Sequence, residues 1–171
     1  QNDNPEGTQP INLVAPGAGA IVTIFDAAAA VVAEAGGTIA GGHTIRNPEP
    51  IFGLAVQGVV DPARVFRKGG GRPGDVLVLS KPLGTGLALA GGSTADKAAA
   101  IAGMRQLNRA ASEELQSLGG AVHAATDVTG YGLAGHGWEM AERGGVQVVI
   151  DTDGLRTYPA ARAAAERGIR T

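Results

Sequence analysis

The sequence contains no cysteine among its 171 residues, which excludes a disulfide framework, a thiolate zinc site and a cysteine nucleophile. Its 14 basic and 16 acidic side chains leave a net charge of −2, so it lacks the clustered positive charge that binds nucleic acids and anionic membranes. It also has no run of about 20 strongly apolar residues, the length that crosses a bilayer, and no basic segment before an apolar one, as a secretory leader has. We therefore expect a globular protein without nucleic-acid or membrane partners.

Aromatic residues are scarce, at 4% of the chain, whereas the 28 glycines stand between well-patterned apolar runs. With 44% hydrophobic residues the chain can bury a core, and its length suits one domain or two small halves. Because the first residue is Gln1, we also expect that the natural sequence continues upstream or is processed at this point.

Hydrophobic periodicity predicts alternating helices and strands. Apolar residues that recur every three or four positions predict helices at about residues 19–35, 94–118, 131–143 and 159–167. Short apolar runs predict strands at residues 11–15, 38–40, 51–60, 76–80, 121–125 and 146–150. This alternation fits an α/β or an α+β architecture, and periodicity alone does not choose between them.

The glycine-rich segment Lys68–Gly74 (KGGGRPG) is the clearest flexible joint that the sequence predicts. We place a domain boundary there. Residues 1–68 would form one half, residues 69–74 the linker, and residues 75–171 the other half.

The first candidate ligand site is the run Gly41, Gly42, His43 and Thr44, directly after a predicted strand. Two adjacent glycines let the backbone come close to a ligand, and consecutive amides can hold an anion such as a phosphate. Thr44 adds a hydroxyl, and His43 adds a ring nitrogen that can donate or accept. A tight turn with a satisfied histidine explains the same residues, since paired glycines are common in turns.

The second candidate is Asp127, in the segment Thr126–Gly132 (TDVTGYG). A carboxylate between a strand end and a glycine-rich helix start is well placed to hold Mg²⁺, while phosphate oxygens face the positive end of the helix. The competing interpretation makes Asp127 or Thr129 a helix N-cap. Spacing alone does not separate the two.

The remaining motifs point to structure more than to chemistry. The turn Lys81–Gly86 (KPLGTG) imitates the start of a dinucleotide fingerprint, but Leu89 stands at the third glycine position and no P-loop pattern occurs. His123 and His136 do not have a metal-binding spacing. We expect His123 in the core or at an interface, and His136 in a packing or capping position.

Taken together, these segments are more specific than any one of them. The runs AGGHTIRNPEPIFGLAVQGVV, RPGDVLVLSKPLGTG and HAATDVTGYGLAGHGWEMAERGGV follow in this order, with MRQLNRA before the third. This combination resembles the selenophosphate synthetases (selenide, water dikinases) over most of residues 11–150. Other ATP-using enzymes of the aminoimidazole-ribonucleotide-synthetase-like superfamily, such as thiamine-monophosphate kinases and hydrogenase maturation proteins, share the fold but not the pairing of GGHT with KPLGTG.

The resemblance implies an α+β fold of two halves, of the aminoimidazole-ribonucleotide-synthetase-like (PurM-like) type, with an incomplete N-terminal half that pairs across a homodimer. It implies a cytoplasmic enzyme that converts ATP, selenide and water to selenophosphate, AMP and phosphate, with Mg²⁺ and often K⁺. By motif, Gly41, Gly42, His43 and Thr44 would contact the nucleotide phosphates, and Asp127 would bind Mg²⁺. The run of residues 74–86 would serve the fold and domain packing.

This sequence also departs from the family pattern. The family's cysteine or selenocysteine, its catalytic lysine, several N-terminal aspartates and its final C-terminal segment have no counterpart here. The resemblance therefore places no catalytic residue in this chain, which we expect to be inactive alone. Two other interpretations stay open: a non-catalytic nucleotide-binding or dimerisation module of the same fold, and a different ATP-dependent kinase of the superfamily.

Overall fold

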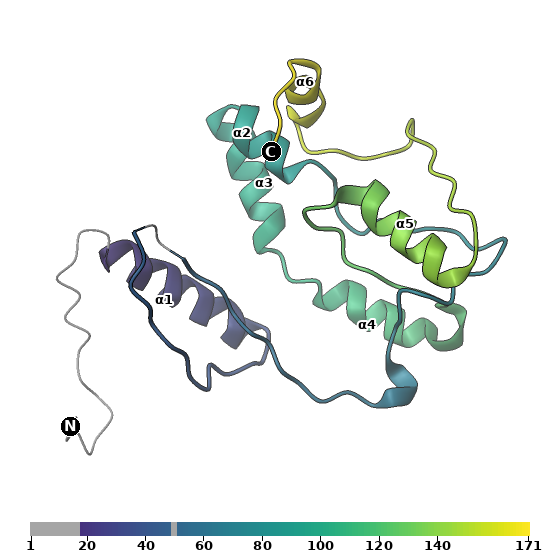
Figure 1. Ribbon diagram of the computed structural model, residues 1–171, viewed down its shortest axis with the longest axis horizontal. Coiled ribbons are helices and arrows are strands. Elements are labelled where there is room, and N and C mark those ends of the chain that lie inside the picture. Colours follow the sequence, from purple (N-terminus) through teal and green to yellow (C-terminus); the bar gives the residue numbers. More distant parts are fainter. Residues whose placement is uncertain (1–17, 49–50) are drawn as a thin grey trace. The chain divides into compact units, whose positions relative to one another are not determined.

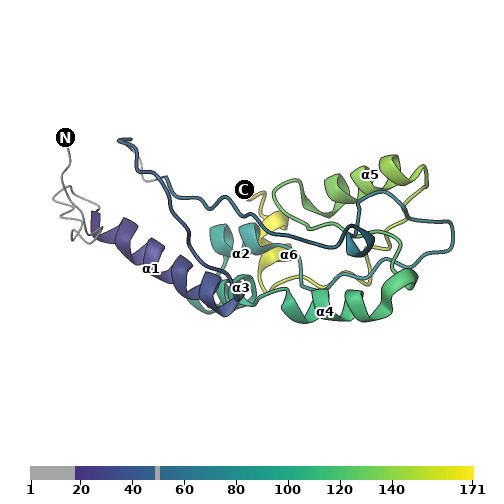
Figure 2. The same cartoon turned by 90° about the horizontal axis from the view of Figure 1, so that it is seen from below.

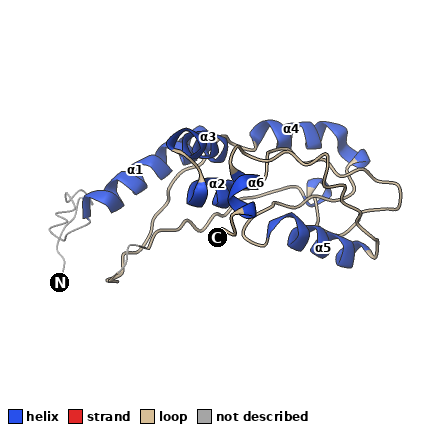
Figure 3. Ribbon diagram, turned by 90° about the horizontal axis from the view of Figure 1, so that it is seen from above, coloured by secondary structure: helices blue, strands red, loops and turns tan. Residues whose placement is uncertain are grey.

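The computed structural model describes residues 18–48 and 51–171, so the predicted strand at residues 11–15 lies outside the described residues. The chain forms two compact units, Gln1–Gly58 and Val59–Thr171. Within the described ranges the regular elements are helices, joined by turns and extended chain (Figure 1, Figure 3). None of the helices in these ranges is both long enough and apolar enough to cross a membrane.

Unit 1 contains helix α1 (Ala18–Glu34), which confirms the first predicted helix almost to the residue. The helix ends where Gly36 takes a left-handed conformation, with φ at 80°. The amide of Gly36 donates to the carbonyl of Ala33 and that of Gly37 to the carbonyl of Val32, both at 2.9 Å. These two bonds occupy carbonyls that the end of a helix otherwise leaves free, which is why glycine follows the last turn.

In unit 2, three helices pack together: α2 (Thr85–Gly91), α3 (Thr94–Arg105) and α6 (Ala161–Glu166). A capping box starts α3, because the Ser93 hydroxyl accepts from the Asp96 amide while the Asp96 carboxylate accepts from the Ser93 amide. The residues buried between these helices are small apart from one tyrosine: Ala88, Ala100, Tyr158, Ala161 and Ala164.

Glycines allow the backbones of this cluster to approach closely. A Cβ atom added at Gly84 would lie 2.6 Å from the Cβ of Ala161, and one at Gly103 would collide with the hydroxyl of Tyr158. The chain before α2 also meets the chain before α6 directly, since Leu83 donates to Arg156 and accepts from Tyr158, both at 2.9 Å. Because interiors are packed as densely as crystals, these contacts leave no room for larger side chains.

The rest of unit 2 contains the helices α4 (Arg109–Leu118) and α5 (Gly132–Gly144) and the short 3₁₀ turns η1 (Pro62–Arg64) and η2 (Gly119–Ala121). Extended segments of the unit run between α4 and α5 (Figure 2, Figure 3). α5 ends at Gly144, and the Gly145 after it has a left-handed φ of 62°.

Two helical predictions were wrong. A single helix was expected at residues 94–118, but α3 and α4 are separated at residues 106–108, where the Gln106 backbone is extended and its carbonyl accepts a hydrogen bond from the Lys81 ammonium group. The glycine-rich run at residues 82–86 was expected to be a turn, but α2 begins within it. Packing of α2 against α3 and α6 outweighs the low helix propensity of its glycines.

The predicted strands that fall in the described residues were also wrong as strands. Those segments are non-helical chain without a paired ladder, and one isolated parallel bridge joins Leu83 to Thr157. Several of their apolar side chains are exposed, among them Val56, Val78 and Val149. A strand exists only through hydrogen bonds to a neighbour, so an apolar run alone does not create one. The described part of the chain therefore does not confirm the α+β division into two halves.

The first glycines of the predicted joint at residues 69–74 lie close to other segments of unit 2. A Cβ at Gly69 would lie 2.7 Å from the carbonyl oxygen of Arg143, and one at Gly70 would lie 2.5 Å from that of His123. Arg67, just before these glycines, accepts a hydrogen bond from the amide of Ala125 at 3.0 Å. The glycines thus permit close contact with two other segments. The division between the two units falls after Gly58, and the domain boundary at residues 69–74 stays a prediction.

Candidate functional site

A pocket of about 370 Å³ lies in unit 2, where three segments meet. One wall is the chain that enters α2, the second is the end of α3 with Asn108, and the third is the turn before α5. Its lining includes Lys81, Leu83, Thr85, Met104, Asn108, Val128, Thr129, Leu133 and Tyr158. The structure thus brings the KPLGTG motif and the TDVTG motif to one pocket, although the sequence separates them by some forty residues.

Asp127 is exposed beside this pocket. The next two residues, Val128 and Thr129, line the pocket, whereas Asp127 itself does not. No described residue forms a hydrogen bond or an ion pair with the Asp127 carboxylate. The neighbouring hydroxyl of Thr126 is buried without a partner in the described structure. The turn therefore presents a free carboxylate and an unsatisfied hydroxyl side by side in the sequence.

The competing N-cap interpretation of this turn is wrong. The N-cap of α5 is Tyr131, and no side chain caps the first turn of that helix. Thr129 instead directs its hydroxyl to the ring of His136. With the capping role excluded, Asp127 has no structural task in the described contacts.

The donor set fits a metal that arrives with a ligand better than a resident metal. In the described ranges no group of three His, Cys, Asp or Glu side chains could hold a metal ion by itself. Mg²⁺ in nucleotide sites is usually held by one or two carboxylates together with phosphate oxygens and water. One exposed carboxylate at Asp127 is compatible with that arrangement.

The run Gly41, Gly42, His43 and Thr44 lies in unit 1 as exposed chain without a hydrogen-bonded turn. A Cβ at Gly41 or Gly42 would meet nothing within 4 Å, so the backbone here is open to an approaching ligand. The tight turn expected as the competing interpretation is absent from these four residues. Because this run and Asp127 belong to different units, their use in one site stays a prediction.

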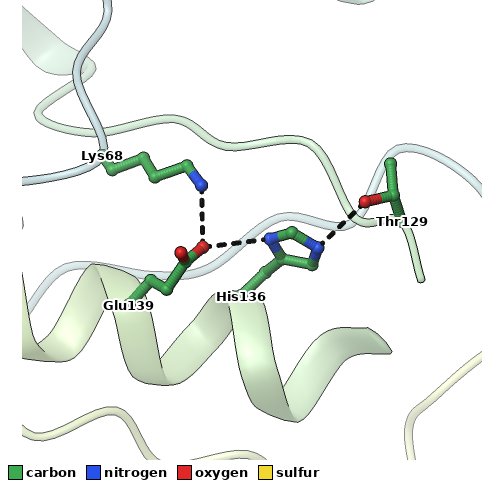
Figure 4. A network of polar contacts seen from close by, with 4 residues as sticks. All are labelled: Lys68, Thr129, His136 and Glu139. Carbon is green, nitrogen blue, oxygen red and sulfur yellow. Dashed lines mark hydrogen bonds and ion pairs between the residues drawn. The ribbon is translucent and has the colours of Figure 1, made fainter. Parts of the chain in front are cut away.

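The structure also contains a polar network that the sequence analysis missed (Figure 4). Lys68 donates to Oε2 of Glu139 at 2.7 Å, and Nδ1 of His136 lies 3.2 Å from the same oxygen. On the other side of the ring, Nε2 of His136 lies 3.2 Å from the hydroxyl of Thr129. The ammonium group of Lys68, and to a smaller extent the imidazole, hold the pKa of Glu139 below its ordinary value.

His136 is the best-buried member of this network, with 4% of its surface exposed, and its ring lies 6.0 Å from that of Tyr131. Its spacing from Glu139, three residues along α5, is the signal that could have suggested a pair on one helix face. Lys68 and Thr129 come from other segments, so no local pattern connects them to the helix. The expected packing or capping role of His136 omits these polar contacts.

A second histidine pair lies in the same unit. Nδ1 of His123 is 2.9 Å from both carboxylate oxygens of Asp75. The Asp75 carboxylate also accepts a hydrogen bond from the backbone amide of Arg72 at 2.8 Å. That amide, first, and then the His123 side chain lower the pKa of Asp75 from its ordinary value. The contact between Arg72 and Asp75 closes a turn at the end of the glycine-rich segment, and neither Asp75 nor His123 lines the pocket.

Comparison with known proteins places the sequence of this chain in a family. The family model of the AIR synthase related protein, C-terminal domain, matches residues 72–168. A selenide, water dikinase of Caldanaerobacter subterraneus is 43% identical over 143 residues, which cover 81% of this chain and 41% of that protein. The enzyme of the same name from Myxococcus xanthus is 45% identical, with 80% of this chain and 40% of the relative covered. That of Paraburkholderia xenovorans is 44% identical, with 88% and 44% covered.

The chain thus spans about two fifths of the length of the curated relatives it matches. No solved structure matches it. The family match begins at Arg72 and includes every residue that lines the pocket, from Lys81 to Tyr158. The chain therefore belongs to the AIR synthase related proteins, whose C-terminal domain it carries, and its resemblance to the selenophosphate synthetases is confirmed.

Proposed function

We propose that this chain is part of a selenophosphate synthetase, which phosphorylates selenide with ATP and releases AMP and phosphate. The observation that carries the proposal is the free, exposed carboxylate of Asp127 in the turn before α5, in a chain whose curated relatives are named selenide, water dikinases. Nucleotide and selenide are the substrates in this proposal, and K⁺ is a further candidate cofactor.

Asp127 would bind Mg²⁺ together with oxygens of the triphosphate. When bound, the ion neutralises charge on the phosphate groups. Gly41 and Gly42 would offer backbone amides to the phosphates, and His43 and Thr44 would add side-chain donors. The open space around both glycines supports this role, because nothing prevents a phosphate from reaching the backbone.

The chain supplies phosphate and metal ligands in this proposal but no nucleophile, since it contains no cysteine. We therefore propose that this chain binds nucleotide without turning it over. We further propose a cytoplasmic homodimer in which unit 1 meets its copy. Exposed apolar side chains in that unit, at Ile45, Ile51 and Val56, support a partner surface there.

Calorimetry of Mg²⁺·ATP binding to the 171-residue chain tests the metal assignment. The Asp127→Ala variant should lose about tenfold or more in the Mg²⁺-dependent part of ATP affinity, which corresponds to about 1.4 kcal/mol. Asp153→Ala is a matched control, because Asp153 is also an exposed carboxylate but neither of its neighbours in the sequence lines the pocket, whereas Val128 beside Asp127 does. Equal affinities of the parent and the Asp127→Ala variant would show that Asp127 is not a metal ligand.

Product analysis separates the proposal from the other members of the superfamily. The full product of the gene, supplied with ATP and selenide, should release AMP and phosphate. Formation of ADP on a different small acceptor would identify another kinase of the same fold. Nucleotide binding with neither product would identify a binding module.

A further inference from the structure

The segment between Asp127 and α5 is held by few contacts. The amide of Gly132 donates to the carbonyl of Thr129 at 2.9 Å and closes a turn. This turn spans residues 129–132, two residues after Asp127, and contains glycines at 130 and 132, of which Gly132 has a left-handed φ of 69°. Glycine gives an unfolded or loosened turn more conformations than any other residue, so such a turn needs an anchor to keep one geometry.

The side chain of Thr129 supplies that anchor. Its hydroxyl lies 3.2 Å from Nε2 of His136, which sits one helical turn inside α5 and is almost completely buried. The ring in turn is fixed from its other nitrogen by Glu139, and Glu139 is fixed by Lys68 (Figure 4). The turn is therefore connected, through one ring, to a helix and to Lys68 at the start of the glycine-rich segment at residues 68–74.

The same contacts assign the proton on the ring. An ionised carboxylate only accepts hydrogen bonds, and the lowered pKa of Glu139 keeps it ionised at neutral pH. Nδ1 of His136 must therefore carry the hydrogen that faces Glu139. In the neutral ring Nε2 then has a lone pair, so the Thr129 hydroxyl donates its hydrogen to Nε2.

We propose that Lys68, Glu139 and His136 are positioning residues, which fix the tautomer of His136 so that it anchors Thr129, and thereby hold the turn at residues 129–132 that directly follows Asp127 and Val128. The anchoring stands on the contacts alone, whereas its consequence for Mg²⁺·ATP rests on the proposed function. None of the three residues touches the ligand in this arrangement. They act through Thr129, which lines the pocket next to Asp127.

The ring proton is observable by nitrogen NMR of the imidazole groups. The chain contains three histidines, and the ring signals that disappear in a His136→Asn variant are those of His136. At about pH 8, where an ordinary histidine is neutral, His136 should show a protonated Nδ1 and an unprotonated Nε2. A ring protonated at Nε2 in the parent protein would overturn the proposal.

Two matched pairs of variants test the anchor. Glu139→Gln keeps an oxygen that can accept from both Lys68 and His136, because one carboxylate oxygen makes both contacts, whereas Glu139→Leu removes it. Thr129→Ser keeps the hydroxyl, whereas Thr129→Val removes it. We expect the Leu and Val variants, but not the Gln and Ser variants, to exchange the Gly132 amide hydrogen about three- to tenfold faster, with α3 amides unchanged. Equal protection of Gly132 in all four variants would overturn the proposal.

Binding of Mg²⁺·ATP gives the functional consequence. Thr129→Val and Glu139→Leu should weaken the Mg²⁺-dependent part of ATP affinity by about three- to tenfold, whereas Thr129→Ser and Glu139→Gln should keep the affinity of the parent protein. If Asp127→Ala fails to change that affinity, the metal assignment is refuted, and Gly132 exchange still decides the anchor. If Gly132 exchange responds but affinity does not, the link between the anchor and Asp127 is refuted.

Discussion

The substitution Gly84→Ala tests the packing of α2 against α6 most directly. Gly84 combines two constraints: its φ is 89°, and a Cβ there would lie 2.6 Å from the Cβ of Ala161. A left-handed conformation costs a residue with a Cβ about 1–2 kcal/mol. Overpacking a close contact costs about 1–3 kcal/mol, and the Ala161 methyl has no rotamer with which to move away. We therefore expect Gly84→Ala to lower the free energy of unfolding by about 2–5 kcal/mol.

Two further variants separate these contributions. Gly74 has a φ of 94° and nothing within 4 Å of its would-be Cβ, so Gly74→Ala should cost the conformational part alone, about 1–2 kcal/mol. Ala161→Gly removes the methyl that Gly84→Ala would meet. The double variant should therefore be more stable than the sum of the two single effects predicts, by about 1–3 kcal/mol.

Urea denaturation followed by far-ultraviolet circular dichroism measures all four variants, because the described regular structure is helical. Gly154→Ala is a control, since Gly154 has no positive φ and no atom within 4 Å of its would-be Cβ. Equal losses in Gly84→Ala and Gly74→Ala would show that the contact with Ala161 does not exist. Strict additivity of the Gly84 and Ala161 effects would refute it as well.

Three other outcomes follow from the structure. Ser93→Ala removes the capping hydroxyl of α3 and should cost about 1 kcal/mol, seen as a melting temperature lower by about 2–4 °C; an unchanged melting temperature would contradict the cap. Because the pKa of Asp75 is lowered in the fold, chiefly by the Arg72 amide and then by His123, the unfolded chain binds its proton first as the pH falls. The stability this carboxylate contributes is thus complete above about pH 4 and is lost below it, and urea titrations should show a smaller acid dependence in Asp75→Asn. Gly42→Val should weaken Mg²⁺·ATP binding without changing stability, because its Cβ would meet nothing within 4 Å, and a large loss of stability would contradict this.

Local sequence signals predicted the helices that have a clear hydrophobic period and a glycine after their last turn. The expected helix at residues 19–35 is α1, and the one at residues 131–143 is α5, each displaced by one residue. Both end before a glycine with positive φ, Gly36 and Gly145, which is a local preference of the backbone. The family resemblance also came from motifs alone, because these motifs are contiguous runs of sequence.

Partners distant in the sequence decided the remaining elements. α2 forms in a glycine-rich run because α3 and α6 cover it, and α3 is separated from α4 where Lys81 reaches the carbonyl of Gln106. The expected strands lack paired neighbours in the described residues, and an apolar run does not specify which neighbour would pair with it.

The candidate site shows the same division. The sequence by itself determined that Asp127 follows an apolar run and precedes a helix, and that Gly41 and Gly42 leave the backbone accessible. Only the tertiary structure excluded the N-cap role of Asp127 and joined Lys68, Glu139, His136 and Thr129 into one network. The physical reason is the distance along the sequence over which each effect acts. Helix period and glycine conformation act within a few residues. Side-chain hydrogen bonds and close packing join groups as far apart as Lys68 and Glu139, which come together only when the chain folds.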